Sequence, residues 1–227
     1  MSSVHAFLFG VYPYIALTVF LLGSLVRFER EQYTWRSEST QLLHRGALRL
    51  GSVLFHVGVL GIFGGHLVGL LTPIAVFNAL GITHEAKQML AMVAGGVLGG
   101  MAFAGISILI WRRLSHPRLR AVTGLGDRVI LVWLWATLAL GLSTIVLSAG
   151  HRDGALMVLF MQWAQGIVTL RGDAAQYIVA APLLFKVHVA MGMTLFVLFP
   201  FTRLVHVWSG FAAVGYLTRA WQLVRPR

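Results

Sequence analysis

The 21-residue segment GSVLFHVGVLGIFGGHLVGLL, Gly51–Leu71, carries no charged residue and contains two histidines, His56 and His66. About 20 predominantly apolar residues are enough for a helix to cross a bilayer, so this segment is predicted to span a membrane. Histidine inside a span is costly and marks a functional site by default. Glycines, which lack side-chain bulk, let a flat group approach the helix backbone. They share the span with the histidines at Gly58, Gly61, Gly64, Gly65 and Gly69. We therefore expect this helix to hold two prosthetic groups.

The composition places the whole chain in the membrane class. Of its 227 residues, 58% are hydrophobic and 11% are charged, and the mean hydropathy is +0.80. The chain has no cysteine, which excludes disulfides, Fe–S clusters and thiolate metal sites. The net charge of +11 would suggest nucleic acid in a soluble protein. Here the cations lie in particular loops, so membrane topology explains them and no nucleic acid is expected.

The predicted fold is an all-α integral membrane protein, a single domain over residues 1–227 with five transmembrane helices. The spans are expected at about 7–26, 51–71, 89–111, 129–147 and 182–207. The first apolar run has no basic segment before it and no small-residue cleavage site after it, so it is expected to be retained. The amphipathic piece Gly154–Leu170 is expected to lie on the surface rather than to form a sixth span. Residues 208–227 are expected to form a cytoplasmic tail that binds partner subunits.

The distribution of lysine and arginine predicts the orientation. All but four of the 18 lie on one side of the predicted membrane; the four on the other side are Lys87, Arg152, Arg171 and Lys186. Cytoplasmic loops carry the excess of positive residues. Five spans then place the N-terminus outside, in the periplasm, and the C-terminus in the cytoplasm of a bacterial cytoplasmic (inner) membrane protein.

Four of the nine histidines lie in predicted spans, and their depth sorts them into two pairs. His66 and His188 are expected near the outer face, and His56 and His206 near the inner face. Each pair can supply both axial ligands to one iron. A straight helix separates the histidines of the second span by about 15 Å and those of the fifth by about 27 Å. A bend at Pro200 is one way to absorb this difference.

Two neutral imidazoles at each site, with no carboxylate or thiolate at the same depth, favour two b-type haems. Copper held by histidine and methionine is the main rival, since Met191 and Met193 lie near His188. Haem propionates are anionic and need partners near a membrane surface. The cations placed for the inner haem are Arg27, Arg112, Arg113 and Arg203, and those placed for the outer haem are Lys87, Lys186 and Arg152.

Two haems at different depths form an electron path, and a lipid-soluble quinol is a natural donor to it. Lys87, beside His84 and Glu85 at the outer start of the third span, can donate a hydrogen bond to a quinol oxygen and favour loss of its proton. The residues alone allow an equal alternative, an interfacial anchoring lysine.

The chain resembles, from end to end, the γ subunit family of respiratory nitrate reductases. The matching pieces are VYPYIALTVFLLGSLVRFEREQYTWR from residue 11, LFHVGVLGIFGGHLVGLLTP from residue 54, EAKQMLAMVAGG from residue 85 and RLVHVWSGFAAVGYLTRAWQLVR from residue 203.

The resemblance implies a quinol-oxidising cytochrome b subunit. It assigns His56 and His206 to an inner haem and His66 and His188 to an outer haem. It puts the quinol site at Lys87, which we expect Gly65, His66 and Gly69 to share. Electrons from menaquinol or ubiquinol would pass to an Fe–S β subunit and a molybdenum α subunit in the cytoplasm, where nitrate is reduced, and protons would leave outside. Nothing in this chain is predicted to bind nitrate.

Three other readings differ in class. A cytochrome b anchor of a formate dehydrogenase or hydrogenase would share the haems and differ in its partner. A transporter or channel would need acidic residues or broken helices at mid-membrane, and the predicted spans have no carboxylate at that depth. A haem-free anchor leaves the four histidines of the spans unexplained.

Overall fold

The computed structural model describes residues 1–31, 35, 45–121, 123–150 and 153–217. Within these residues the secondary structure is entirely helical. Five of the described helical segments are long and apolar enough to cross a membrane: Ser3–Arg30, Gly46–Leu71, His84–Ser115, Leu125–Ser148 and Leu183–Phe201. The predicted all-helical architecture with five spans is confirmed.

The first span contains α1 (Ser3–Ala6), η1 (Phe7–Val11) and α2 (Tyr12–Arg30), and the next three spans are α3 (Arg45–Leu71), α5 (His84–Ser115) and α7 (Leu125–Ser148). Short helices α4 (Ile74–Ala79) and α6 (Pro117–Ala121) connect spans. The helices extend beyond the predicted apolar runs because local capping sets their ends. At the start of α5, for example, the Thr83 hydroxyl accepts a hydrogen bond from the Ala86 amide, which makes polar residues of the loop helical.

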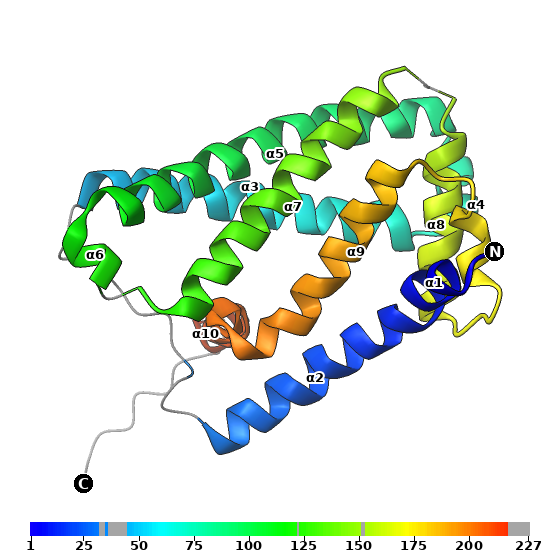
Figure 1. Cartoon of the computed structure of the whole chain (residues 1–227). Helices are drawn as coiled ribbons and strands as arrows, with labels where there is room; N and C mark the ends of the chain where they lie inside the picture. Colours follow the sequence, from blue (N-terminus) through cyan, green and yellow to red (C-terminus); the bar gives the residue numbers. More distant parts are fainter. Residues whose placement is uncertain (32–34, 36–44, 122, 151–152, 218–227) are drawn as a thin grey trace, which may run out of the picture.

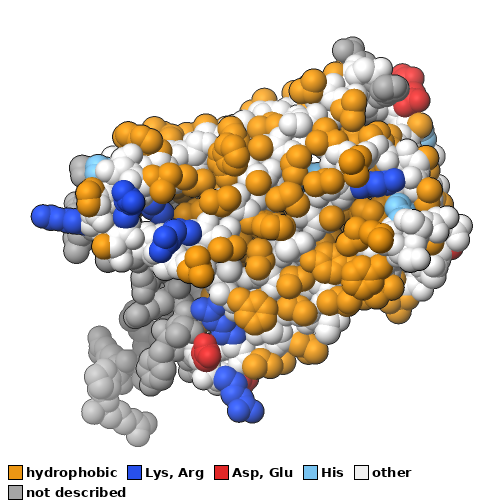
Figure 2. Space-filling model, in the orientation of Figure 1, with side chains coloured by type: hydrophobic (Ala, Val, Ile, Leu, Met, Phe, Trp, Pro, Cys, Tyr) orange, Lys and Arg blue, Asp and Glu red, His pale blue; other side chains and the backbone are white. Residues whose placement is uncertain are grey.

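The long helices form an arc (Figure 1). The main contacts join α3 to α5, α5 to α7, α7 to α9 (Leu183–Leu198), and α9 to α2. Glycines make the first of these contacts close: a Cβ at Gly58 would lie 2.5 Å from the Ala102 backbone nitrogen, and one at Gly105 would overlap the Phe55 backbone. The visible face is mainly apolar between the ends, and lysine and arginine side chains gather at its α6 end (Figure 2).

The fifth span is not one helix to residue 207, as the sequence predicted. Helix α9 ends at Leu198 and is followed by two 3-10 turns, η4 (Phe199–Phe201) and η5 (Arg203–Val205), before α10 (His206–Leu217) begins. Pro200 has no amide hydrogen to continue a helix, and Thr202 is extended, at φ −126° and ψ −180°. The Arg27 Nη1 atom donates to the Pro200 and Thr202 carbonyls at 2.7 and 2.9 Å, so α2 supports the break.

Helix α8 (Ala155–Val168) is too short to span a membrane, but it is more buried than the surface helix that was predicted. Met161, Trp163 and Ile167 are at most 5% exposed. Trp163 Nε1 donates to the Phe9 carbonyl at 2.9 Å. The apolar stripe of α8 therefore packs on protein, with the turn η3 (Ala174–Ile178), across one end of the bundle (Figure 1).

Part of the predicted polar segment after the first span, Arg152, and residues 218–227 of the predicted tail lie outside the described residues. The described part of the tail continues α10 to Leu217.

Candidate functional site

The structure brings together both predicted histidine pairs. The ring centroids of His56 and His206 are 6.0 Å apart, and those of His66 and His188 are 6.3 Å apart. Two imidazoles that bind one metal ion from opposite sides, each through a nitrogen about 2 Å away, have centroids about 6 Å apart. The spacing of each pair therefore suits one metal ion between its rings.

The break after α9 makes the two pairs compatible. His56 and His66 are ten residues apart on the continuous helix α3, a rise of about 15 Å. His188 lies on α9 and His206 begins α10, so the extended residue and 3-10 turns lie between them. The chain can thus bring His188 to the depth of His66 and His206 to the depth of His56.

Three of the four histidines are oriented by the backbone next to them. Nδ1 of His56 lies 2.7 Å from the Ser52 carbonyl, Nδ1 of His66 lies 2.8 Å from the Ile62 carbonyl, and Nδ1 of His206 lies 2.6 Å from the Arg203 carbonyl. A carbonyl only accepts hydrogen bonds, so Nδ1 must carry the proton. Nε2 is then left unprotonated, and a neutral imidazole with this arrangement is prepared to ligate a metal.

The fourth histidine, His188, lies against a glycine of another helix. A Cβ at Gly141 of α7 would lie 2.9 Å from Cε1 of His188 and 3.5 Å from its Nε2. A real Cβ could not stay so close, so only glycine leaves the imidazole in this place. This role could not be predicted from the sequence, because Gly141 lies far from His188 in the chain.

The five glycines between His56 and Leu71 fall into two groups. Only one group leaves open space, so the prediction that all five let a flat group approach the backbone is corrected. A Cβ at Gly58 or Gly61 would meet Leu98 or Ala102 of α5, so these two glycines serve helix packing. At Gly64, Gly65 and Gly69 an added Cβ would have no heavy atom within 4 Å outside its own helical surroundings. The surface of α3 is therefore open at these three positions, and Gly69, three residues after His66, lies on the face of the helix that carries His66.

The donor set fits a metal already held by a macrocycle. Among the described residues no group of three or more histidine, cysteine, aspartate or glutamate side chains could hold an ion. A bare zinc ion needs about four ligands, whereas a haem iron needs only its axial ones. Met193 packs against the apolar cluster around α8 and η3, a sufficient reason for its presence without copper.

Lys87 is 6% exposed and is held from three sides. Its Nζ donates to the Gly69 carbonyl at 2.8 Å and to the Met161 sulfur at 2.7 Å, and it lies 3.9 Å from the centre of the Phe77 ring. Two of the residues predicted for the quinol site, Lys87 and Gly69, are thus in direct contact. Phe77 of α4 and Met161 of α8 were not predicted, because only the fold brings those connecting segments over Lys87.

Most of the cations predicted as propionate partners of the inner haem have protein partners. Arg27 binds the carbonyls at the break, while Arg113 and Arg203 both lie 3.4 Å from the Asp127 carboxylate. Arg112 is 1% exposed, an unusual burial for a guanidinium. The Arg113–Asp127–Arg203 network joins α5, α7 and η5 just before His206.

A bundle of five apolar helices with two stacked cross-helix histidine pairs belongs to the class of membrane cytochromes b. The family model described as nitrate reductase gamma subunit matches residues 5–227. The chain therefore belongs to the nitrate reductase gamma subunit family, whose members are membrane-anchored subunits of an oxidoreductase complex.

Individual relatives agree over their whole lengths. The chain is 48% identical over 227 residues to the respiratory nitrate reductase 1 gamma chain of Escherichia coli (strain K12), covering 100% of both chains. It is 46% identical to the respiratory nitrate reductase 2 gamma chain of the same organism, covering 100% of this chain and 99% of the relative. Identity to the nitrate reductase gamma chain of Bacillus subtilis (strain 168) is 36% over 220 residues, 97% of each chain.

Proposed function

We propose that this chain is the di-haem cytochrome b subunit of a respiratory nitrate reductase. It takes electrons from quinol near the outer membrane face and passes them inward to an Fe–S β subunit, which delivers them to a molybdenum α subunit. The observation that carries the proposal is the pair of facing imidazoles at each of two depths, 6.0 and 6.3 Å between centroids.

Four histidines hold the two b haems in this proposal. His56 and His206 would hold the inner haem, and His66 and His188 would hold the outer haem. When bound, each haem supplies one-electron redox chemistry. At His56, His66 and His206 the Nδ1–H donates a hydrogen bond to a backbone carbonyl, which fixes the ring orientation and leaves Nε2 to the iron. Arg27, Arg112 and Arg203 are the proposed propionate partners of the inner haem.

Lys87 binds the quinol head group together with Gly65, His66 and Gly69. Its ammonium has three donors, two of which go to Gly69 and Met161. In this proposal a quinol oxygen accepts from the remaining donor. A cation there would stabilise the quinolate and so favour release of the quinol protons, and a haem held by His66 would supply the one-electron chemistry.

Quinol oxidation on the outer side would conserve energy, because its protons leave outside and its electrons go to the cytoplasm. The proposed orientation, with the N-terminus outside, is supported by the gathering of lysine and arginine at the α6 end of the molecule (Figure 2). That end contains the Arg113–Asp127–Arg203 network.

A haem count tests the proposal. The purified chain should contain two b haems, measured by the pyridine haemochrome assay and by a reduced-minus-oxidised visible spectrum. His66→Ala should retain one haem and lose quinol-dependent nitrate reduction, while nitrate reduction with an artificial donor to the soluble subunits should persist. His116→Ala, a change at a histidine between α5 and α6, is the control and should retain both haems. Unchanged haem content in His66→Ala would reject the ligand assignment.

A further inference from the structure

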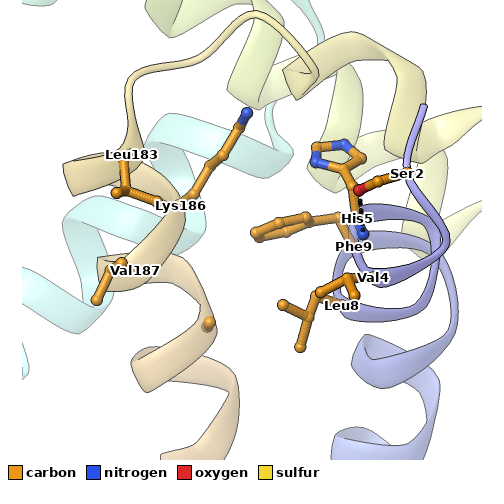
Figure 3. A pocket seen from close by; sticks show the side chains of 9 residues that line it. Ser2, Val4, His5, Leu8, Phe9, Leu183, Lys186 and Val187 are labelled. Carbon is orange, nitrogen blue, oxygen red and sulfur yellow. Dashed lines mark hydrogen bonds between the residues drawn. The ribbon is translucent and has the colours of Figure 1, made fainter.

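A groove opens between the N-terminal helices and the start of α9 (Figure 3). It has a volume of about 210 Å³. One wall is formed by α1 and η1 and the other by the first turns of α9; the lining residues are Ser2, Val4, His5, Leu8, Phe9, Leu183, Lys186, Val187 and Ala190. We propose that this groove seats one acyl chain of an anionic phospholipid, whose phosphate binds Lys186.

Both walls are held in place by contacts outside the groove. On the N-terminal wall, His5 Nε2 lies 2.9 Å from the Ala175 carbonyl, and the Phe9 carbonyl accepts the Trp163 hydrogen bond. Deeper in the bundle the walls meet, where the Tyr12 hydroxyl lies 2.8 Å from the Thr194 hydroxyl. The groove is therefore a preformed wedge, and a ligand need not order it.

The groove opens toward the hydrocarbon region. Val4, Leu183 and Val187 are 67%, 74% and 38% exposed, although they flank or line it. The two walls belong to the segments Ser3–Arg30 and Leu183–Phe201, each of which is apolar enough to span the membrane. Exposed apolar side chains at such positions face lipid. Acyl chains of the bilayer therefore surround this groove.

Lys186 determines which lipid fits. It lies within one helical turn of the start of α9, at the depth where a span meets the head groups. Its Nζ donates to the Val179 carbonyl, and an ammonium has further donors to offer. The lining contains no carboxylate, and His5 and Ser2 are occupied with each other and with Ala175. One cation above an apolar wedge complements a phosphate above an acyl chain.

The size of the groove argues against a ring-bearing ligand. Pockets for drug-sized molecules and cofactors usually enclose about 300–1,000 Å³, whereas this groove encloses about 210 Å³ and is open along its side. A quinol would also need several polar groups around its head, whereas six of the nine lining residues are apolar. A narrow, flexible acyl chain meets both conditions.

Native mass spectrometry of the purified haem-loaded chain, titrated with dioleoyl phosphatidylglycerol or dioleoyl phosphatidylcholine, tests the proposal. We expect the wild type to bind one phosphatidylglycerol about five-fold more tightly than phosphatidylcholine, the preference that one lysine near a membrane surface gives. Lys186→Gln should remove this preference. Ala190→Phe, which fills the groove, should weaken binding of both lipids.

Arg171→Gln is the matched control, since it removes a cation that pairs with Asp173 outside the groove. It should bind both lipids as the wild type does. An undiminished preference for phosphatidylglycerol in Lys186→Gln, or unchanged binding in Ala190→Phe, would overturn the proposal. Haem content tests whether Lys186 serves the outer haem instead. Loss of the outer haem in Lys186→Gln would assign the ammonium to that haem and would also overturn the lipid proposal.

Discussion

At the residue scale, the paired histidines could be predicted from depth alone, because each span fixes how far its residues lie from either face. What the sequence could not show is how each imidazole is held. His56, His66 and His206 use carbonyls of their own chain segment, but His188 depends on a glycine in another helix. Contacts of that kind arise only from the packing of α7 on α9.

The glycine behind His188 gives a sharp prediction. Gly141→Ala would place a Cβ 2.9 Å from Cε1 of His188, so the imidazole must rotate or shift. We expect the outer haem to be lost or its midpoint potential to change, with the inner haem unaffected, as measured by redox titration of the visible spectrum. Gly126→Ala, on the same helix and with no heavy atom within 4 Å of the added Cβ, is the control. An unaltered outer haem in Gly141→Ala would show that His188 does not need this space.

Lys87 is the second residue whose role rests on contacts that the sequence did not show. Lys87→Gln keeps much of the side-chain length and removes the charge that interacts with the Phe77 ring. We expect both haems to remain and quinol-dependent turnover to fall by at least about tenfold, the effect of one hydrogen bond from a charged group. Turnover with wild-type quinol kinetics would remove Lys87 from the site. Arg171→Gln, which changes a cation paired with Asp173, is the control and should retain quinol turnover.

At the element scale, hydropathy predicted five spans, but it could not show where the fifth helix ends. Residues 182–207 are apolar almost throughout, and a window of apolar residues has the same mean hydropathy whether it is straight or broken. Pro200 hinted at a bend. The extended Thr202 and the support from Arg27 are tertiary features, and they decide that a full break forms. The same reasoning applies to α8, whose amphipathic stripe suits a membrane surface and a protein surface equally well.

The support of the break by α2 can be tested directly. Arg27→Gln removes the hydrogen bonds to the Pro200 and Thr202 carbonyls and leaves both acceptors without this donor. We expect η5 and His206 to lose their position, so the inner haem should be depleted and the outer haem retained, as measured by haem content and visible spectra. Arg30→Gln, one turn further along α2, should leave both haems in place. Equal retention of the inner haem in the two variants would contradict this role for Arg27.

At the scale of the whole molecule, the charge asymmetry predicts a topology that can be measured. The chain has no cysteine, so a single introduced cysteine can be labelled without background. In intact cells with a permeable outer membrane, Ser3→Cys should react with a membrane-impermeant maleimide. Ser115→Cys, at the far end of α5, should react only after the inner membrane is opened. The reverse pattern would invert the proposed direction of proton release.

The arc of helices has a consequence for how the protein matures. The main contacts run from α3 through α5, α7 and α9 to α2, and the two histidine pairs connect α3 with α9 and α10 across the open side. Each haem iron would link α3 to α9 or α10 and so close the open side of the arc. Insertion into the bilayer and pairing of neighbouring helices must therefore come first, and cofactor capture afterwards. In a haem-deficient cell we expect a membrane-inserted precursor to accumulate. Its open side between α3 and α9 should make it unusually sensitive to membrane proteases.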